Sequence, residues 1–497
     1  MTRWPKTTAI LSWLLLGIAG AATLIAALVS VENWRGDRAW AAFQAELRTR
    51  GVPMEVMAYL PPPIPDRLNF FKAPIMKDLL YPGGNAPSAT FAALRKKFVY
   101  LQGNRVLGNI GAGQTADFSA LRNELEKRGL TADSKGAQPA AGVVAALEPL
   151  RGMILDLRAA AAQRPLEANS IVSPEQRLAA LRPGSPQPPD LSLDSVFFLG
   201  WALALRAQAE LAIGDIDDAS ADTIMTLRLA RGNMSPPATV LGVLVGNALL
   251  GLAAQPIWQG CANHQWNAAQ LVHFQDLMET LNPVADYDRS VRLRRAATSY
   301  FLMQMPGRDI RTFYRPQDMG VPRWPWALRG WREQNVIRSW NAFEKDVIGC
   351  LDPAAGCVRP SRAEEGARQL ALIARSSSPY DALLRVSYQR PSIPINFAMG
   401  TAQSENIREE AITGCALERF RLARGAYPDT LDALTGKYLP HPTHDVIDGR
   451  PLRYLLDADG SFKLYSIGWN ERDDGGVPDP KGSPASGDWV WFSKVMR

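Results

Sequence analysis

An uncharged apolar stretch near the N-terminus constrains this chain more than any other feature. Residues 7–31 contain no charged side chain, and the part from Ile10 to Val29 consists mostly of Leu, Ile, Ala and Val. A helix of about 20 apolar residues crosses the hydrocarbon core of a bilayer. The apolar core of a cleaved signal peptide, which is the alternative, is usually about 7–15 residues long. We therefore expect an uncleaved, single-pass membrane anchor.

The charges around this stretch predict which side of the membrane holds the rest of the chain. Arg3 and Lys6 precede it, and positive residues favour the cytoplasmic side. The residues from Glu32 onward would then lie outside the cytoplasm. We expect a protein of the bacterial cytoplasmic (inner) membrane, with the bulk of its 497 residues in the periplasm.

The composition is typical of a globular protein. Hydrophobic residues make up 46% and charged residues 21% of the chain, and its length allows two or three domains. The formal net charge of +6 is small and spread along the chain, so we expect no nucleic-acid partner.

The patterns beyond the anchor predict a mainly α fold. Residues 32–50 carry apolar side chains at helical spacing, so the anchor helix continues, whereas the proline-rich residues 60–65 must run extended. We expect a transmembrane helix, a large helical extracytoplasmic domain and a small C-terminal α+β module. The expected parts are residues 1–31 (cytoplasmic N-terminus and anchor), 32–86 (juxtamembrane helix and Pro-rich segment), 87–400 (helical domain) and 401–497 (α+β module).

Two stretches of the helical domain have marked patterns. Residues 195–231 read as an apolar helix, a turn at Gly214-Asp215 and a second helix, which resembles a single tetratricopeptide-type hairpin. The stretch from Ala238 to Gln255 is apolar almost throughout. Prolines bound it on both sides, with Pro256 at its end, so a buried core helix is favoured over a second membrane span.

Tryptophan and arginine alternate between residues 322 and 340. This combination is typical of a membrane interface, a glycan-binding surface or a protein partner. The alternative is that the tryptophans pack into the core while the arginines are solvated. The candidate interaction residues are Trp324, Trp326, Trp331, Arg323, Arg329 and Arg332.

The four cysteines divide into two kinds. Cys350 and Cys357 flank a turn-rich loop that could close as a disulfide in an oxidising periplasm, or they could remain thiols. Cys261 and Cys415 are expected to be small buried residues.

The C-terminal residues predict a compact module. A helix with one apolar face ends at Gly425, and a short helix carrying Leu431 and Leu434 follows. Residues 452–456 and 461–467 alternate like strands around a turn, and residues 489–492 could add an edge strand.

Residues 405–480 resemble the globular part of the pseudopilins of type II secretion systems. The resemblance rests on Leu417-Glu-Arg-Phe420, Gly425-Ala-Tyr-Pro428, Leu431, Leu434, Asp448-Gly449, Tyr454 and Tyr465-Ser-Ile-Gly468. The rest of the chain resembles membrane-anchored bacterial proteins in general. No pseudopilin leader precedes the anchor, so we expect this module to act as a fold or docking surface and not to polymerise into a fibre.

The resemblance also implies a metal site. In the major pseudopilins the loop after the last matching strand binds calcium, and by position Asp473 and Asp474 would be the ligands. Calcium prefers several oxygen donors, which two carboxylates on a Gly-rich loop can partly supply. The alternative is a solvated acidic loop.

The sequence does not single out an enzyme. The one histidine cluster, His441-Pro-Thr-His444, contains a proline that favours an extended loop over a rigid metal site. We expect a non-enzymatic scaffold or interaction protein of the cell envelope, linked to a secretion or pilus-like assembly. The alternatives are an envelope enzyme that acts on peptidoglycan or another glycan through acidic residues, and a helical domain that binds a lipid or small ligand. A deep acidic cleft would favour the enzyme, and a large apolar cavity would favour ligand binding.

Overall fold

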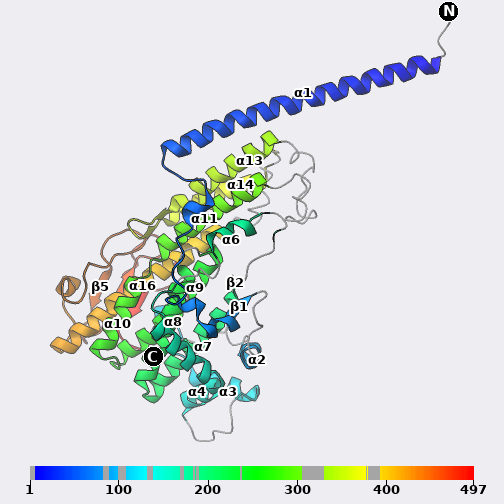
Figure 1. The fold of residues 1–497 in the computed structure, drawn as a ribbon. Helices are drawn as coiled ribbons and strands as arrows, with labels where there is room; N and C mark the ends of the chain where they lie inside the picture. Colours follow the sequence, from blue (N-terminus) through cyan, green and yellow to red (C-terminus); the bar gives the residue numbers. More distant parts are fainter. Residues whose placement is uncertain are drawn as a thin grey trace, which may run out of the picture.

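The computed structural model of this protein is mainly helical, with a small C-terminal sheet (Figure 1). It describes residues 6–81, 89–98, 108–130, 138–167, 173–182, 185, 190–235, 238–304, 329–376, 378 and 392–496. Of the predicted interaction residues, Arg323, Trp324 and Trp326 lie outside these ranges.

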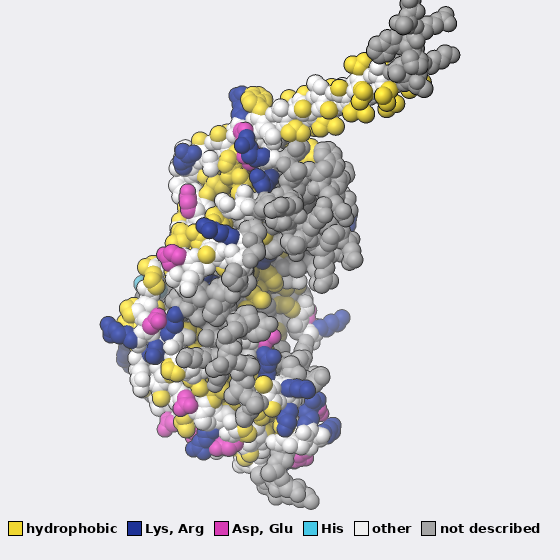
Figure 2. All heavy atoms as spheres, turned by 45° about the vertical axis from the view of Figure 1, so that its right-hand side comes forward, with side chains coloured by type: hydrophobic (Ala, Val, Ile, Leu, Met, Phe, Trp, Pro, Cys, Tyr) yellow, Lys and Arg dark blue, Asp and Glu magenta, His cyan; other side chains and the backbone are white. Residues whose placement is uncertain are grey.

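Helix α1 (Lys6–Thr49) projects from the body of the protein as one continuous rod (Figure 1). At 1.5 Å per residue its 44 residues span about 66 Å, so roughly half of it is enough to cross a bilayer. Exposed apolar side chains cover this helix from Ile10 to Val31 (Figure 2). The predicted helical continuation beyond the anchor is confirmed, and the helix ends just before Gly51, which has a positive φ of 65°.

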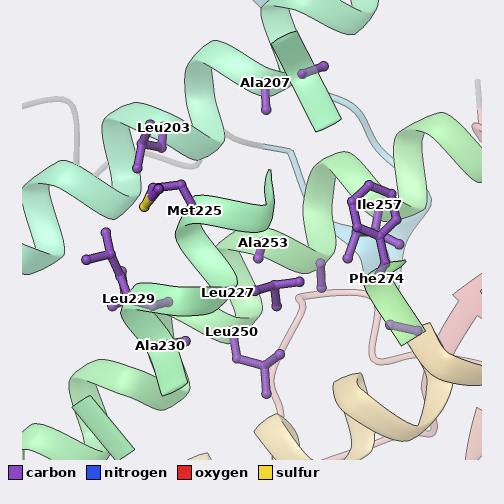
Figure 3. Close-up of a cluster of buried hydrophobic side chains, with 14 of the residues drawn as sticks. Leu203, Ala207, Met225, Leu227, Leu229, Ala230, Leu250, Ala253, Ile257 and Phe274 are labelled. Carbon is purple, nitrogen blue, oxygen red and sulfur yellow. The ribbon is translucent and has the colours of Figure 1, made fainter. Parts of the chain in front are cut away.

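Four consecutive helices form the centre of the body: α7 (Leu193–Ile213), α8 (Ile216–Met234), α9 (Val240–Ala262) and α10 (Ala268–Glu279). Their buried side chains interdigitate in one cluster (Figure 3). The backbones of α7 and α9 approach closely, since a Cβ atom at Gly200 would lie 2.1 Å from Leu249 Cδ2. The predicted hairpin over residues 195–231 is present as α7 and α8, with Gly214 in the left-handed conformation between them.

Helices α7 and α9 are also long and apolar enough to span a membrane. However, 83% of the apolar window of α7 and 61% of that of α9 are buried inside the body, whereas that of α1 is not buried at all. The prediction of a buried core helix beginning near Ala238 is therefore confirmed. Its predicted end at Pro256 was wrong: α9 runs through this proline to Ala262, and Pro256 is itself buried.

The remaining helices surround this centre. The helices that precede it in the chain are α2 (Ala89–Phe98), α3 (Phe118–Lys127), α4 (Pro139–Leu147), α5 (Arg151–Gln163) and α6 (Pro174–Ala180). The helices that follow it are α11 (Pro283–Gln304), α13 (Arg329–Ala342) and α14 (Pro360–Ala374). Two short antiparallel pairs link loops, β1 (Leu80–Tyr81) with β2 (Asp190–Leu191) and β3 (Leu351–Asp352) with β4 (Cys357–Val358).

The C-terminal module consists of α16 (Ser392–Arg424), a 3₁₀ turn (Leu431–Leu434) and three strands, β5 (Arg453–Leu456), β6 (Phe462–Ser466) and β7 (Trp489–Phe492). The strands form an antiparallel sheet in the order β5-β6-β7. The predicted helix stop at Gly425, the hairpin and the third strand are all present. The predicted domain boundary at residues 400 and 401 falls inside α16.

The module shares its core with the helical body. Buried residues of α16 and the sheet, such as Cys415 and Trp491, belong to the same apolar cluster as Trp258 of α9. The indole Nε1 of Trp258 donates a hydrogen bond of 2.7 Å to the carbonyl oxygen of Phe492 in β7. Helix α16 thus connects the module to the body through a continuous interior.

Candidate functional site

A cavity of about 630 Å³ lies where the C-terminal module meets α9 and α16. A volume of this size is typical of sites for small molecules. Helices α9 and α16 supply one side, β7 and the loop before it supply another, and the turn at residues 109–114 completes the wall.

The wall formed by α16 carries a polar stripe. Gln403, Asn406, Ile407 and Glu410 have the spacing of one helical face and all line the cavity. Only 1% of Asn406 and 2% of Glu410 is exposed to solvent. Burial raises the pKa of Glu410 well above its ordinary value, the negative charge of Asp445 adds to this, and a hydrogen bond from Asn406 opposes it. The surroundings of Glu410 therefore favour its uncharged form.

Three buried oxygen atoms of this wall lack a hydrogen-bond partner among the described residues. They are Oδ1 of Asn406 and Oε1 of Glu410 on α16, and Oε1 of Gln255 on α9. A buried polar atom left unpaired costs about 1–3 kcal/mol. Three such atoms on one cavity wall are available to accept hydrogen bonds.

The opposite wall is held in shape by Asp488. Only 2% of this residue is exposed, and its carboxylate accepts hydrogen bonds from the backbone N–H groups of Asp474, Gly476 and Val477. Burial raises the pKa of Asp488, and these N–H donors counteract the effect. A carboxylate surrounded by backbone donors organises a loop, which here sets the position of residues 476–484 along the cavity.

The predicted calcium ligands lie on the same loop, outside the cavity lining. Asp473 accepts hydrogen bonds from Tyr465 and from the backbone of Gly475, and its Oδ2 lies 3.4 Å from Arg453 Nε. The carboxylate of Asp474 accepts a hydrogen bond of 3.0 Å from Asn470. Calcium binding at these two residues stays a prediction.

Within the described ranges, the acidic side chains grouped closely enough to hold a metal ion are elsewhere. Glu210, Asp215 and Asp218 have carboxylate oxygens within 4.8 Å of one another at the α7–α8 turn. The guanidinium of Arg206 lies 2.6 Å from Glu210 Oε1 and 3.8 Å from Asp218, so a positive charge of the protein already neutralises part of this group.

The described part of the Trp/Arg segment contacts the anchor helix. Helix α13 packs along the end of α1, where Trp331 Nε1 donates a hydrogen bond of 3.0 Å to Glu32 and Arg329 pairs with Asp37. Trp331 is only 8% exposed. Of the two alternatives for this tryptophan, burial inside the protein is therefore the one that the structure shows, and Arg332 lies on the same helix.

The crossing of α1 and α13 depends on two glycines. A Cβ atom at Gly36 would lie 2.2 Å from Gly330 Cα, and a Cβ atom at Gly330 would lie 2.0 Å from the carbonyl oxygen of Glu32. Because no side chain separates them at this point, the two backbones are in direct contact. The anchor is thereby attached to the body just beyond its apolar stretch.

The cysteines lie buried, and His444 lies close to an acidic side chain. All four cysteines are free and buried, and burial raises the pKa of Cys350 to about 12 and that of Cys357 to about 11. Such thiols are poor nucleophiles. His444 lies within the module, with its Nδ1 3.8 Å from Glu409, and does not line the cavity.

The sequence did not reveal the cavity residues. The spacing of Gln403, Asn406 and Glu410 could have indicated a polar stripe on one face of α16, but the sequence alone does not show that this face is buried.

Comparisons of the chain with protein-family models, with curated proteins and with solved structures gave no match.

Proposed function

We propose that this is a membrane-anchored binding protein that holds a small polar molecule in the cavity between α16 and the C-terminal module. The observation that carries the proposal is the set of three unpaired oxygens, on Gln255, Asn406 and Glu410, that line one cavity of about 630 Å³. The sequence analysis gave ligand binding by the helical domain as an alternative. The proposed site lies instead at the boundary between that domain and the C-terminal module.

The location proposed for this activity is the periplasmic face of a bacterial inner membrane. The support is the apolar N-terminal helix, with Arg3 and Lys6 before it and charged residues from Glu32 onward. The ligand would then be a molecule of the envelope or of the medium.

Binding accounts for the cavity better than hydrolysis does. A glycosidase needs two carboxyl groups that act together across the scissile bond. Here Asp488 and Asp479 are both engaged by backbone N–H groups, so the described lining offers Glu410 no second free carboxylate to act with it. Groups held in this way suit recognition.

The test is native mass spectrometry of the full-length protein in detergent, with a search for a co-purified small molecule. We expect a bound molecule in the wild type and its loss in Asn406→Ala. The matched control is Asn233→Ala, because Asn233 is also a fully buried helical asparagine with an unpaired Oδ1, but does not line the cavity. Equal occupancy in both variants would contradict the proposal.

A scaffold role is the second candidate, and an exposed sheet edge favours it. Strand β5 is an edge strand, and Leu455 and Leu456 on it are 42% and 37% exposed. Exposed apolar edge strands commonly pair with another chain. In-cell crosslinking should recover secretion or pilus components with the wild type and lose them with Leu455→Lys. Deletion of the whole module is unsuitable because the module shares its core with the body.

Calcium binding by the acidic loop is a separate proposal that rests on the pseudopilin resemblance. We expect calcium to raise the melting temperature of the wild type, and not that of an Asp473→Asn, Asp474→Asn double variant. The same small shift in both would contradict it.

A further inference from the structure

We propose that the molecule bound in the cavity carries a primary ammonium group, and that this group is held by Gln255, Asn406 and Glu410. The inference rests on the proposed function, because it names the chemical class of that ligand. It is argued from the hydrogen-bonding atoms and charges that line the cavity.

The unpaired atoms of the cavity wall are all oxygens. Oδ1 of Asn406 and Oε1 of Gln255 are amide oxygens, which can only accept hydrogen bonds, and an ionised Glu410 is likewise only an acceptor. An ammonium group has three N–H donors and no acceptor. A hydroxyl group offers only one donor, so a polyol would need several hydroxyls in the right places to pair the same atoms.

The cavity lining carries more acidic than basic side chains. The charged side chains among the described lining residues are Glu410, Asp479 and Asp488, against a single basic residue, Lys463. Asp488 is satisfied by backbone donors, and Asp479 by Ser486 and by the backbone of Lys481 and Ser483. Glu410 is therefore the acidic group that still has an oxygen to offer. A cationic ligand matches an acidic lining of this kind.

Binding of such a ligand also changes the protonation of Glu410. In the free cavity its protonated form is favoured, because burial and the nearby Asp445 raise its pKa. An ammonium group beside it favours the carboxylate. The carboxyl O–H bond then breaks, the proton goes to solvent, and the ammonium keeps its three N–H bonds. Binding thus releases up to one proton per ligand.

This release sets the sign of a pH dependence. Affinity should rise with pH, by up to about tenfold per unit, while free Glu410 is protonated and the amine is still charged. The titratable groups that face or influence Glu410 are Asp445, Asp479, Asp488 and Lys463. The contribution of Glu410 to this pH dependence is isolated by a substitution of nearly the same shape that cannot ionise.

The experiment is isothermal titration calorimetry on the full-length protein in detergent with paired probes. Ethanolamine is compared with ethane-1,2-diol, and putrescine with butane-1,4-diol, because each pair differs mainly in ammonium against hydroxyl and both amines stay charged at pH 8. Titrations at pH 6 and pH 8, each in two buffers of different ionisation enthalpy, count the protons released. The variants are Glu410→Gln, which is isosteric, and Glu364→Gln on α14 as a control outside the cavity.

We expect at least one amine to bind at least tenfold more tightly than its hydroxyl partner, with proton release and tighter binding at pH 8. Glu410→Gln should abolish both the proton release and the pH dependence, and Glu364→Gln should retain them. Equal binding of the paired probes, or binding of an amine without proton release, would overturn the inference. A co-purified molecule without an amine would also overturn it and leave the proposed function standing. If no probe binds and no molecule co-purifies, the proposed function itself fails.

Discussion

Replacement of Asp445 by asparagine should destabilise the C-terminal module strongly. Asp445 is fully buried, and its carboxylate accepts hydrogen bonds from the backbone N–H groups of Ile447 (2.8 Å) and Ile467 (2.9 Å) and from the hydroxyl of Ser466 (2.7 Å). It also pairs with Arg453. The carboxylate thus joins the turn before β5 to the end of β6.

The magnitude follows from the loss of a buried charge. Breaking a buried ion pair from one side costs about 3–5 kcal/mol. Asparagine keeps one acceptor oxygen, but its NH₂ group would replace the other oxygen and face N–H or O–H donors that it cannot pair with. We therefore expect a loss of about 3 kcal/mol in the free energy of unfolding. The matched control is Asp448→Asn, because Asp448 pairs with the same Arg453 but its side chain is 23% exposed. This control should lose about 1 kcal/mol or less.

The assay is urea unfolding of the full-length protein in detergent, followed by tryptophan fluorescence. Trp469, Trp489 and Trp491 lie in the module and report on its unfolding. A loss below 1 kcal/mol in Asp445→Asn, or an equal loss in Asp448→Asn, would show that the carboxylate does not organise the module as described.

Two further predictions concern the anchor and the core. Gly330→Ala should separate α13 from α1, because the added Cβ would lie 2.0 Å from the carbonyl oxygen of Glu32. Trypsin should then cleave the chain faster between α1 and the body. The control Gly152→Ala, whose Cβ would meet no atom within 4 Å, should leave the cleavage rate unchanged. Burial raises the pKa of Glu210 from 4.5 to about 9, so the fold penalises its ionisation and loses stability as the pH rises from about 4.5 toward 9. Glu210→Gln should therefore gain melting temperature relative to the wild type between pH 5 and pH 8, and Asp217→Asn should show no such trend; a constant difference across this range would contradict the assignment.

Some elements were predictable because their causes are local in sequence. The exposed apolar helix at the N-terminus follows from an uninterrupted apolar stretch, and the α7–α8 hairpin follows from a left-handed Gly214 between two helical patterns. The same holds for the sheet of the module, where alternating residues flank a short turn at residues 457–460. Each of these signals lies within a few residues of the structure that it specifies.

Pro256 shows where a local rule fails. A proline inside a helix removes one backbone hydrogen bond and costs about 3 kcal/mol, which makes a helix end the reasonable expectation. In the structure, α9 continues because Ala253 and Ala254 before the proline, and Ile257 and Trp258 after it, are fully buried in the shared core. Their burial stabilises the helix by more than the proline destabilises it.

The sequence by itself determined that the N-terminal helix is long and apolar enough to cross a membrane, that the body is helical and that a small antiparallel sheet ends the chain. Only the tertiary structure decided where the polar cavity lies and that Trp331 contacts the anchor helix about 300 residues earlier. The physical reason is that helices and turns depend on neighbouring residues, whereas burial depends on which faces meet. Gln255, Asn406 and Asp488 come from distant segments, and they form one site only because α9, α16 and the sheet share a core.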